Sequence, residues 1–343
     1  MLGALACEEQ KPVAPPVQVG KVEQHATLAA TVSDTTISSA VTAGNAGGSQ
    51  YLFVGELGST GSNATLRTLI KPTLSSLTAN GTDVTNVQIK LHVNKGDTGY
   101  TLYAYKANQT GWVQGSGVFG TNASCGGSDC YPPTMSGCSG ATWGTYNCVT
   151  GWGVTGAATG SARASATYGA VTAGWYELSG ANLAADAEGW INAGSTAGWV
   201  IESGGEGVAG SATRMESSTN GTVANRASVT ITYSCYSGYS GSSCADVDEC
   251  ASGAVNACGT GATNCVNSAG SYTCTCNSTY FTGTGTTSCV DINECNTNNG
   301  GCGSATYWTC TNNVGAAPTC TDINECNTNN GGCGSATYWT CTN

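Results

Sequence analysis

Three short segments of the chain carry residue types that could bind a metal ion. Each has a cysteine, an Asp two places later, a Glu five places later and a second cysteine, at residues 244–250, 289–295 and 320–326. Carboxylates gathered this closely repel one another unless a cation offsets their charge, and Ca²⁺ prefers such oxygen ligands. The flanking cysteines persist as disulfides only in an oxidising compartment. The segments therefore predict calcium sites in an extracellular protein.

The overall composition fits that compartment and narrows the function. The chain has 20 Cys among 343 residues, 10 Lys and Arg, and a net charge of −11. Nucleic acids and anionic membranes are bound through clustered positive charge, so we expect divalent cations and neutral glycans as partners instead. No run of about 18 apolar residues could span a bilayer. His25 and His92, the only histidines, offer neither a Ser-His-Asp set nor a zinc cluster, and we expect no enzymatic activity.

The cysteines divide the chain into regions. Cys7 stands alone, four cysteines lie between residues 125 and 148, and fifteen follow from Cys235 onward. We therefore expect a tether over residues 1–25, a cysteine-poor domain over 26–234 with a cysteine-rich insertion at 120–150, and a disulfide-dense region beyond it.

The first seven residues, MLGALAC, resemble the end of a bacterial lipoprotein signal peptide. This resemblance implies a lipid anchor at Cys7 on the outer surface of a bacterial cell, with the Pro-rich residues 8–20 as an extended tether. A free or paired Cys7 is the alternative, because a full signal peptide has an apolar run of roughly 7–15 residues.

Residues 26–234 have the pattern of an all-β domain. Short runs of β-forming residues alternate with Gly, Ser, Asn and Asp, which predicts a β-sandwich. One helix is predicted over 181–193, where Leu183, Ala187 and Trp190 recur at helical spacing. The predicted strands are 27–32, 50–54, 65–70, 86–93, 100–105, 175–178, 198–201 and 228–233.

The order of segments in this region resembles the disaggregatase-related, DNRLRE-type domains of bacterial and archaeal surface proteins. It runs from TVSDTTISS through YLFVGELGS, VTNVQIKLHV and GWYELSGANLAADAEGWI to ASVTITY. The resemblance covers about residues 25–234 and implies a jelly-roll-like sandwich that often associates with polysaccharide. The insertion departs from that family, and its four cysteines allow three pairings that sequence cannot separate: they are Cys125, Cys130, Cys138 and Cys148.

Six tryptophans lie in this domain, and the flat face of an indole can stack on a sugar ring. Trp175, Trp190 and Trp199 fall within predicted elements, so we expect them in the core. Trp143 and Trp152 lie beside the cysteine-rich insertion, where loops on a rigid scaffold carry binding residues. They are the candidates for glycan contact.

Residues 246–289 resemble a complete calcium-binding EGF-like module, and residues 235–245 look like the terminal loop of another, closed by Cys235–Cys244. The resemblance rests on the six cysteines in the family's order and on the segment CVNSAGSYTC. It implies the pairs Cys250–Cys265, Cys258–Cys274 and Cys276–Cys289. It also implies calcium ligation by six oxygens, from the side chains of Asp246, Glu249 and Asn267 and the carbonyls of Val247, Ser268 and Ser271. Asp248 is expected to orient the turn.

The sequence DINECNTNNGGCGSATYWTCTN occupies residues 291–312 and recurs unchanged at 322–343, which indicates an array. Residues 290–320 form a shortened unit with four cysteines. By the same resemblance its pairs are Cys295–Cys310 and Cys302–Cys320. Its implied calcium ligands are Asp291, Ile292, Glu294, Asn312 and Asn313.

Residues 321–343 form an incomplete second copy, whose implied ligands are Asp322, Ile323, Glu325 and Asn343. Cys326 could pair with Cys341, which leaves Cys333 without its expected partner. Either the sequence is a fragment of a longer array, or another chain completes this unit.

One residue separates each closing cysteine from the next Asp, so a cation at that joint would stiffen the chain into a rod of small disulfide-rich modules. The sequence therefore predicts a structural or adhesive surface protein that self-associates into an extracellular filament. The alternative is a carbohydrate-binding module of a surface protein that processes or attaches glycan.

Overall fold

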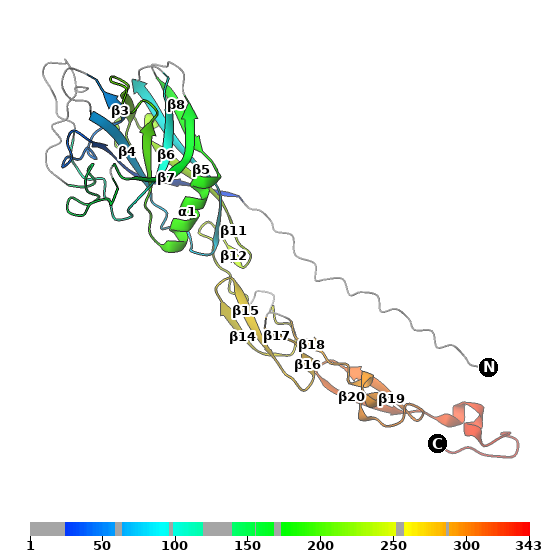
Figure 1. The fold of residues 1–343 in the computed structure, drawn as a ribbon. Helices are drawn as coiled ribbons and strands as arrows, with labels where there is room; N and C mark the ends of the chain where they lie inside the picture. The colour runs from blue at the N-terminus through cyan, green and yellow to red at the C-terminus, as the bar shows by residue number, and fades with distance from the viewer. Residues whose placement is uncertain are drawn as a thin grey trace. The chain divides into compact units, whose positions relative to one another are not determined.

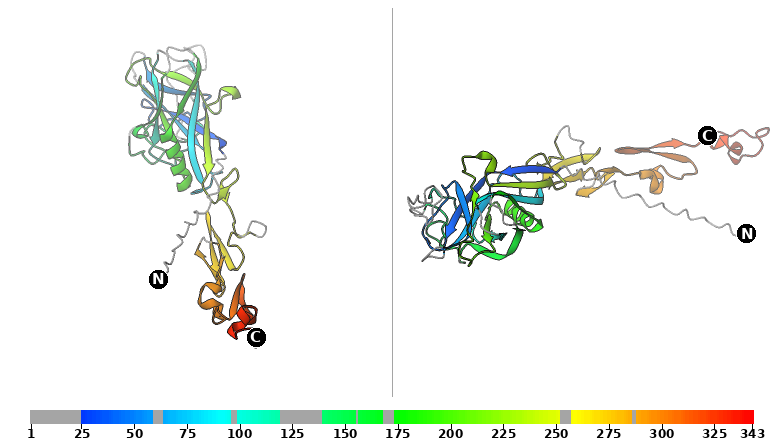
Figure 2. Two further views of the ribbon diagram at one scale, coloured as in Figure 1. Left: turned by 90° about the vertical axis from the view of Figure 1, so that its right-hand side faces the viewer. Right: turned by 90° about the horizontal axis from the view of Figure 1, so that it is seen from above.

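The computed structural model describes residues 25–58, 64–95, 99–118, 139–154, 156–167, 173–251, 257–285 and 288–343. It divides into two compact units, Met1–Ala245 and Asp246–Asn343, which we describe separately (Figures 1 and 2). Cys7, Cys125, Cys130 and Cys138 lie outside the described residues, whereas Cys148 lies within them and is disulfide-bonded. No helix in the described part of the chain is long and apolar enough to cross a membrane.

The first unit is a curled antiparallel sheet. Hydrogen bonds connect its described strands in the order β1-β11-β5-β10-β3-β4-β9-β6-β7, with β2 on β4 and β8 on β5. The strands are β1 (Ala26–Ala30), β2 (Val32–Ser38), β3 (Tyr51–Leu57), β4 (Ala64–Pro72), β5 (Thr82–Lys95), β6 (Thr101–Ala107), β7 (Ala158–Thr167), β8 (Gly174–Ser179), β9 (Trp199–Ser203), β10 (Thr213–Glu216) and β11 (Ser228–Cys235).

The sheet turns a corner within β3. This strand pairs with β10 as far as Val54 and with β4 from Gly55 onward. Gly55 has a φ of +105°, and a Cβ there would lie 2.6 Å from the Ser211 carbonyl oxygen, so only glycine fits. The corner lets one continuous, curled sheet enclose a core, which agrees with the all-β fold predicted from the sequence.

Alternation along β5 shows how the core is built. Val87, Ile89, Leu91 and Val93 point inward and are fully buried, while the residues between them point outward, as a strand with one buried face requires. The helix α1 (Ala181–Ala193) has the predicted bounds and buries Leu183, Ala187 and Trp190. It ends at Gly194 in the left-handed conformation.

Three described strands of the large sheet were not predicted from the sequence. β2 reads VSDTTIS, β7 is built mainly of Ala and Ser, and β10 has four residues. In β2 the polar residues Asp34, Thr35 and Thr36 are buried and held by hydrogen bonds, as when Thr36 Oγ1 accepts from Phe53 N at 2.9 Å. The usual contrast between apolar and polar positions is therefore absent.

The tryptophans correct two expectations. Trp190 and Trp199 are buried as predicted, but Trp175 is 48% exposed, because it lies on the outward side of β8 while Leu178 takes the inward side. Trp152, a candidate for glycan contact, is only 1% exposed, and its Nε1 donates to the Thr142 carbonyl at 2.8 Å. It packs beneath the loop instead of facing solvent.

Trp143 is partly exposed and belongs to a charged network on β4 and β9. The Arg67 guanidinium lies 5.3 Å from the Trp143 ring centroid. It contacts Glu202 through Nη1 at 2.8 Å and Glu206 through Nη2 at 2.8 Å. Arg67 Nε and Nη2 donate to the two carboxylate oxygens of Glu206 at 3.0 and 2.8 Å, and this bidentate pair fixes the neighbouring side chains.

The second unit has little apolar interior. Its strands are β14 (Ala262–Ser268), β15 (Ser271–Cys276), β16 (Phe281–Thr282), β17 (Thr284–Gly285), β18 (Val290–Asp291), β19 (Trp308–Asn313) and β20 (Ala316–Asp322), while β12 (Tyr239–Ser240) precedes it and β13 (Ala245–Asp246) lies at the boundary. Modules this small depend on covalent links for stability.

Disulfides supply those links. In the described part of the second unit each bridge matches a pair expected from the sequence, and so does Cys235–Cys244 at the end of the first unit. Cys333 is free and exposed. The bridges are Cys235–Cys244, Cys250–Cys265, Cys258–Cys274, Cys276–Cys289, Cys295–Cys310, Cys302–Cys320 and Cys326–Cys341.

Two carboxyls with raised pKa values should make the first unit more stable in mild acid. Burial raises the pKa of Glu202 to about 7, with Arg67 opposing the rise and Glu206 adding to it. Burial also raises the pKa of Asp34 to about 6, against hydrogen bonds from Ser218. Between the ordinary carboxyl pKa and these values the folded state binds more protons, so the free energy of unfolding falls as pH rises.

We expect thermal unfolding of the first unit at a higher temperature at pH 5 than at pH 7.5. Each unit of pKa difference between the folded and unfolded states corresponds to about 1.4 kcal/mol. Glu202→Gln should therefore reduce the difference in the free energy of unfolding between pH 5 and pH 7.5 by about 2 kcal/mol. The control is Glu177→Gln, on the exposed side of β8. Calorimetry in saturating calcium measures both, and equal pH dependence in the two variants would contradict the assignment.

Candidate calcium sites

The first candidate site lies at the start of the second unit. The β14–β15 hairpin turns at Gly270, which has a φ of +70°. The Gly270 N–H donates to Asp246 Oδ1, and Asn267 Nδ2 donates to Asp246 Oδ2 at 2.8 Å. The turn of the hairpin and the carboxylate of the acidic motif therefore meet at one point, with Glu249 three residues further along.

The second candidate site repeats this geometry in the shortened unit. Gly315 turns the β19–β20 hairpin with a φ of +67°. Its N–H donates to Asp291 Oδ1 at 2.7 Å, and Asn312 Nδ2 donates to Asp291 Oδ2 at 2.7 Å. The turn has kept its shape although the sequence around it differs from that of the complete module.

Buried oxygens without hydrogen-bond partners mark both sites. They are Glu249 Oε2 and Asn267 Oδ1 at the first, and Asn312 Oδ1 with both carboxylate oxygens of Glu294 at the second. Leaving such an oxygen unpaired costs about 1–3 kcal/mol, and more when it is charged. Since Ca²⁺ is coordinated by carboxylate and amide oxygens, these donors fit a calcium ion that would remove the cost.

The third candidate site repeats the contact between an Asn amide and the Asp of the motif. Asn343 Nδ2 donates to Asp322 Oδ2 at 2.5 Å, and Glu325 follows three residues after the Asp.

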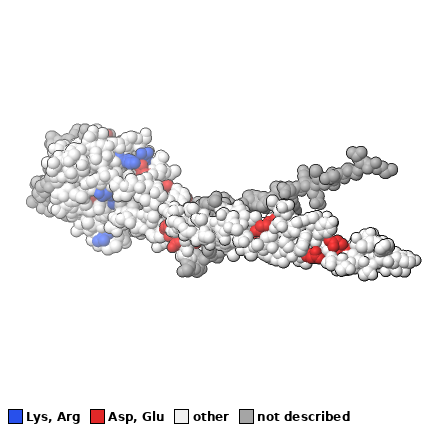
Figure 3. Space-filling view, turned by 90° about the horizontal axis from the view of Figure 1, so that it is seen from below, with Lys and Arg blue, Asp and Glu red and all other residues white. Residues whose placement is uncertain are grey.

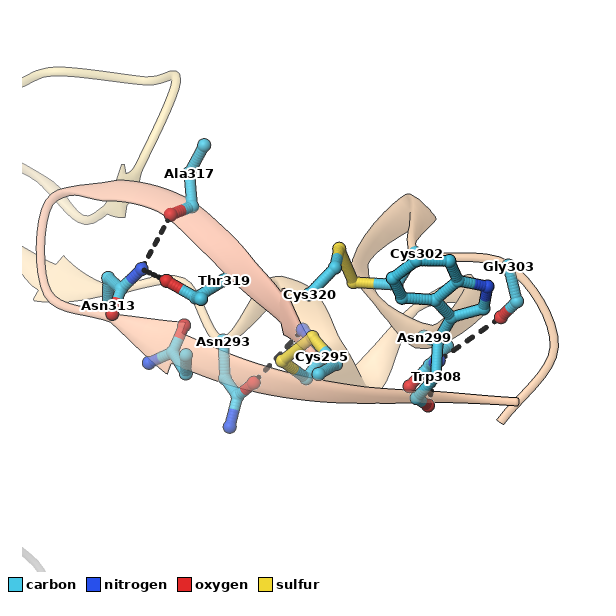
Figure 4. The surroundings of a disulfide bond; sticks show 12 residues. Asn293, Cys295, Asn299, Cys302, Gly303, Trp308, Asn313, Ala317, Thr319 and Cys320 are labelled. Atoms are coloured by element: carbon cyan, nitrogen blue, oxygen red, sulfur yellow. Dashed lines mark hydrogen bonds between the residues drawn. A yellow bond between two sulfur atoms is a disulfide. The ribbon is translucent and has the colours of Figure 1, made fainter. Parts of the chain in front are cut away.

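The residue directly before the Glu of the first two motifs has a different role. Asp248 Oδ1 accepts the Cys250 N–H at 2.9 Å, and Asn293 Oδ1 accepts the Cys295 N–H at 3.1 Å, as Figure 4 shows for the second pair. An uncharged amide makes the same contact as the carboxylate. This side chain thus orients the turn and is not needed as a metal ligand.

Of the expected backbone ligands, two have other contacts as well. The Ser271 carbonyl accepts from Ser268 Oγ at 2.9 Å. Asn313 Nδ2 donates to the Ala317 carbonyl and to Thr319 Oγ1, each at 2.8 Å (Figure 4), which fixes this side chain within its own hairpin. The carbonyls of Val247, Ile292 and Ile323 lie between the Asp and Glu of each motif.

The hairpin glycines were missed as functional residues in the sequence. Gly270 and Gly315 act through their N–H groups, which hold the motif carboxylates in place. Their signal was present in the Ala-Gly and Val-Gly pairs between the two strands of each hairpin, because a two-residue turn often needs a glycine.

The charge of the second unit is unusual. All charged residues from 246 to 343 lie in the three acidic motifs, and this stretch has no Lys or Arg. On the face drawn in Figure 3, the acidic residues of this unit form separate patches. No three His, Cys, Asp or Glu side chains converge as a metal cluster among the described residues, because each site combines two carboxylates with an amide.

Together, the hairpins, disulfides and oxygen donors define a calcium-binding, disulfide-rich module of the kind found in extracellular proteins. More specifically, residues 246–289 match the family model of the calcium-binding EGF domain. No curated protein matches the chain. The likeness of residues 25–234 to DNRLRE-type domains stays a prediction.

Neighbouring acids of one motif provide a matched test of the first site. Glu249→Gln removes a charge from the buried oxygen and should weaken calcium binding there by at least tenfold, whereas Asp248→Asn should leave it within about twofold. Calcium titration of the full chain against a chromophoric chelator measures both. The assignment would be wrong if the two variants lost affinity equally.

Proposed function

We propose that this protein is a non-enzymatic, extracellular structural protein in which calcium stiffens a linear array of small modules. The observation that carries the proposal is where each calcium-binding Asp lies. Asp291 pairs with Phe281 in the last strands of the complete module, and Asp322 pairs with Trp308 in the shortened one. Each Asp is thus built into the module that precedes its own site.

Hydrogen bonds extend this connection by one more residue. The Ile292 N–H donates to the Tyr280 carbonyl at 2.8 Å, and the Ile323 N–H donates to the Tyr307 carbonyl at 2.8 Å. The segment between two modules therefore has no free linker. The first ligands of each of these two calcium sites are fixed by the preceding module. The hairpin that supplies the remaining ligands belongs to the following module.

In the shortened unit a single hairpin both completes the site at Asp291 and holds Asp322 of the next site. Near its turn, Asn312 and Gly315 contact Asp291, while at its open end Trp308 faces Asp322. The two sites are about 14 Å apart along the strand, at roughly 3.4 Å per residue. The loss of the last two EGF cysteines leaves this connection intact.

An aromatic contact closes the joint at the second site. Phe281 is 6% exposed, and a Cβ on Gly315 would lie 2.9 Å from its ring. The Phe281 ring therefore packs against the same turn whose N–H holds Asp291. Calcium binding at this site and the packing of two modules stabilise one another.

This joint is the basis for a stalk or filament on the cell surface. Repeat arrays are quasi-one-dimensional, since each unit contacts only its neighbours, and the two identical 22-residue segments suit an array of adjustable length. We extend the proposal to adhesion and self-association of such arrays, and to a lipid anchor at Cys7 of a bacterial protein.

Removing calcium should make the second unit flexible. Without the cation, the seven carboxylates of residues 246–343 have no opposite charge nearby, so chelation should shorten the mean extension in small-angle scattering and speed proteolysis at the joints. The double variant Asp291→Asn, Asp322→Asn serves as the control and should respond much less to chelator. Unchanged extension and cleavage of the natural chain would refute the proposal.

The aromatic contact provides a second test. Phe281→Ala should weaken calcium binding at the second site several-fold, by loosening the turn at Gly315, and leave the third site unchanged. Thr282→Ala, on the adjacent exposed side chain, is the matched control. Equal effects of the two substitutions in calcium titration would show that the packing does not contribute.

A further inference from the structure

Trp175 lies on an outward face of the first unit, on the strand β8. It is 48% exposed and directly opposite His92 on the neighbouring strand β5. The two rings meet edge to face, with centroids 5.0 Å apart and planes at 62°. The indole therefore has a fixed neighbour and a face open to solvent.

Trp175 is the end of a row of side chains that crosses four strands. His92 Nδ1 lies 2.6 Å from Glu216 Oε2, and Glu216 is opposite Tyr51 on β3. We call Trp175, His92, Glu216 and Tyr51 the aromatic row. Cross-strand neighbours share one face of a sheet, so the row lies on the outward side of the sheet, with Trp175 as its most exposed member.

Buried contacts hold the polar members of this surface in place. Glu216 is only 8% exposed, and its Oε1 accepts from Asn94 Nδ2 at 3.2 Å. Arg214 Nε donates to Asn94 Oδ1 at 2.7 Å, and its guanidinium lies 4.5 Å from the Tyr51 ring centroid. A ligand that used these groups would lose little side-chain entropy on binding.

The charges beside the row are mixed in sign. Lys90 is opposite Glu177, and Arg214 and Glu216 lie on the same strand. Such a surface favours neither an anion nor a cation. It offers a flat apolar ring next to hydrogen-bonding groups, the combination that suits a ligand with apolar faces and hydroxyl edges.

We propose that the aromatic row binds a neutral polysaccharide, with a sugar ring stacked on Trp175 and its hydroxyl groups bonded to His92 and neighbouring polar side chains. Because Trp175 is 48% exposed, its ring is accessible to a sugar within the polysaccharide. The loop tryptophans are less suited, because Trp152 is buried and Arg67 lies over the Trp143 ring. This site does not depend on the calcium-stiffened array.

The test uses the full chain and four neutral hexasaccharides, of β-1,4-linked glucose, N-acetylglucosamine, mannose and xylose, in isothermal titration calorimetry. At least one should bind, and Trp175→Ala should weaken that binding tenfold or more, as removal of a central aromatic contact commonly does. His92→Ala should weaken it several-fold. Trp143→Ala is the matched control, expected to change it less than twofold.

Chelator separates this proposal from the proposed function, because sugar binding should persist without calcium. Trp175 is exposed, so its alanine variant should keep the thermal unfolding temperature of the natural chain. The proposal is overturned if no hexasaccharide binds, or if Trp143→Ala removes binding and Trp175→Ala does not. Loss of self-association in Trp175→Ala by sedimentation, without sugar binding, would also overturn it and assign the face to a second copy.

Discussion

Electrostatic repulsion without a compensating cation is the constraint on which the second unit depends. Its carboxylates lie in three groups, and no Lys or Arg of that unit can neutralise them. In most proteins an acidic surface is tolerated because it is solvated. Here Glu249 Oε2 and both carboxylate oxygens of Glu294 are buried and unpaired, so a divalent ion at these two sites would supply the missing partner.

The two units solve the problem of stability in different ways. The first encloses a continuous apolar core inside a curled sheet and needs few covalent links, since a domain of this size can bury enough surface. The second has short strands and little interior, and its bridges hold the hairpins at the positions where the ligands meet. Disulfides define each module, and under the proposed function calcium at the joints would define how one module continues into the next.

Much of this arrangement could be predicted from the sequence. Cysteine order and the acidic motifs indicated the modules because both are local patterns with fixed spacing, and the bounds of α1 followed from its helical periodicity. β2 could not be predicted, since its buried Asp34 and Thr35 are satisfied by distant partners. Trp175 and Trp152 were misplaced for a similar reason: exposure depends on which face of the sheet or loop a residue takes, and that is set by tertiary pairing.

The shared hairpin of the shortened unit also limits how such a chain can evolve. Side chains on a strand alternate between two faces, so inserting or deleting one residue in β20 would turn Asp322 away from its site. A whole repeat can be gained or lost without this penalty, because the register of every hairpin is preserved. Growth by duplication of 31 residues, as between Asp291 and Asp322, is therefore the change in length that the architecture tolerates.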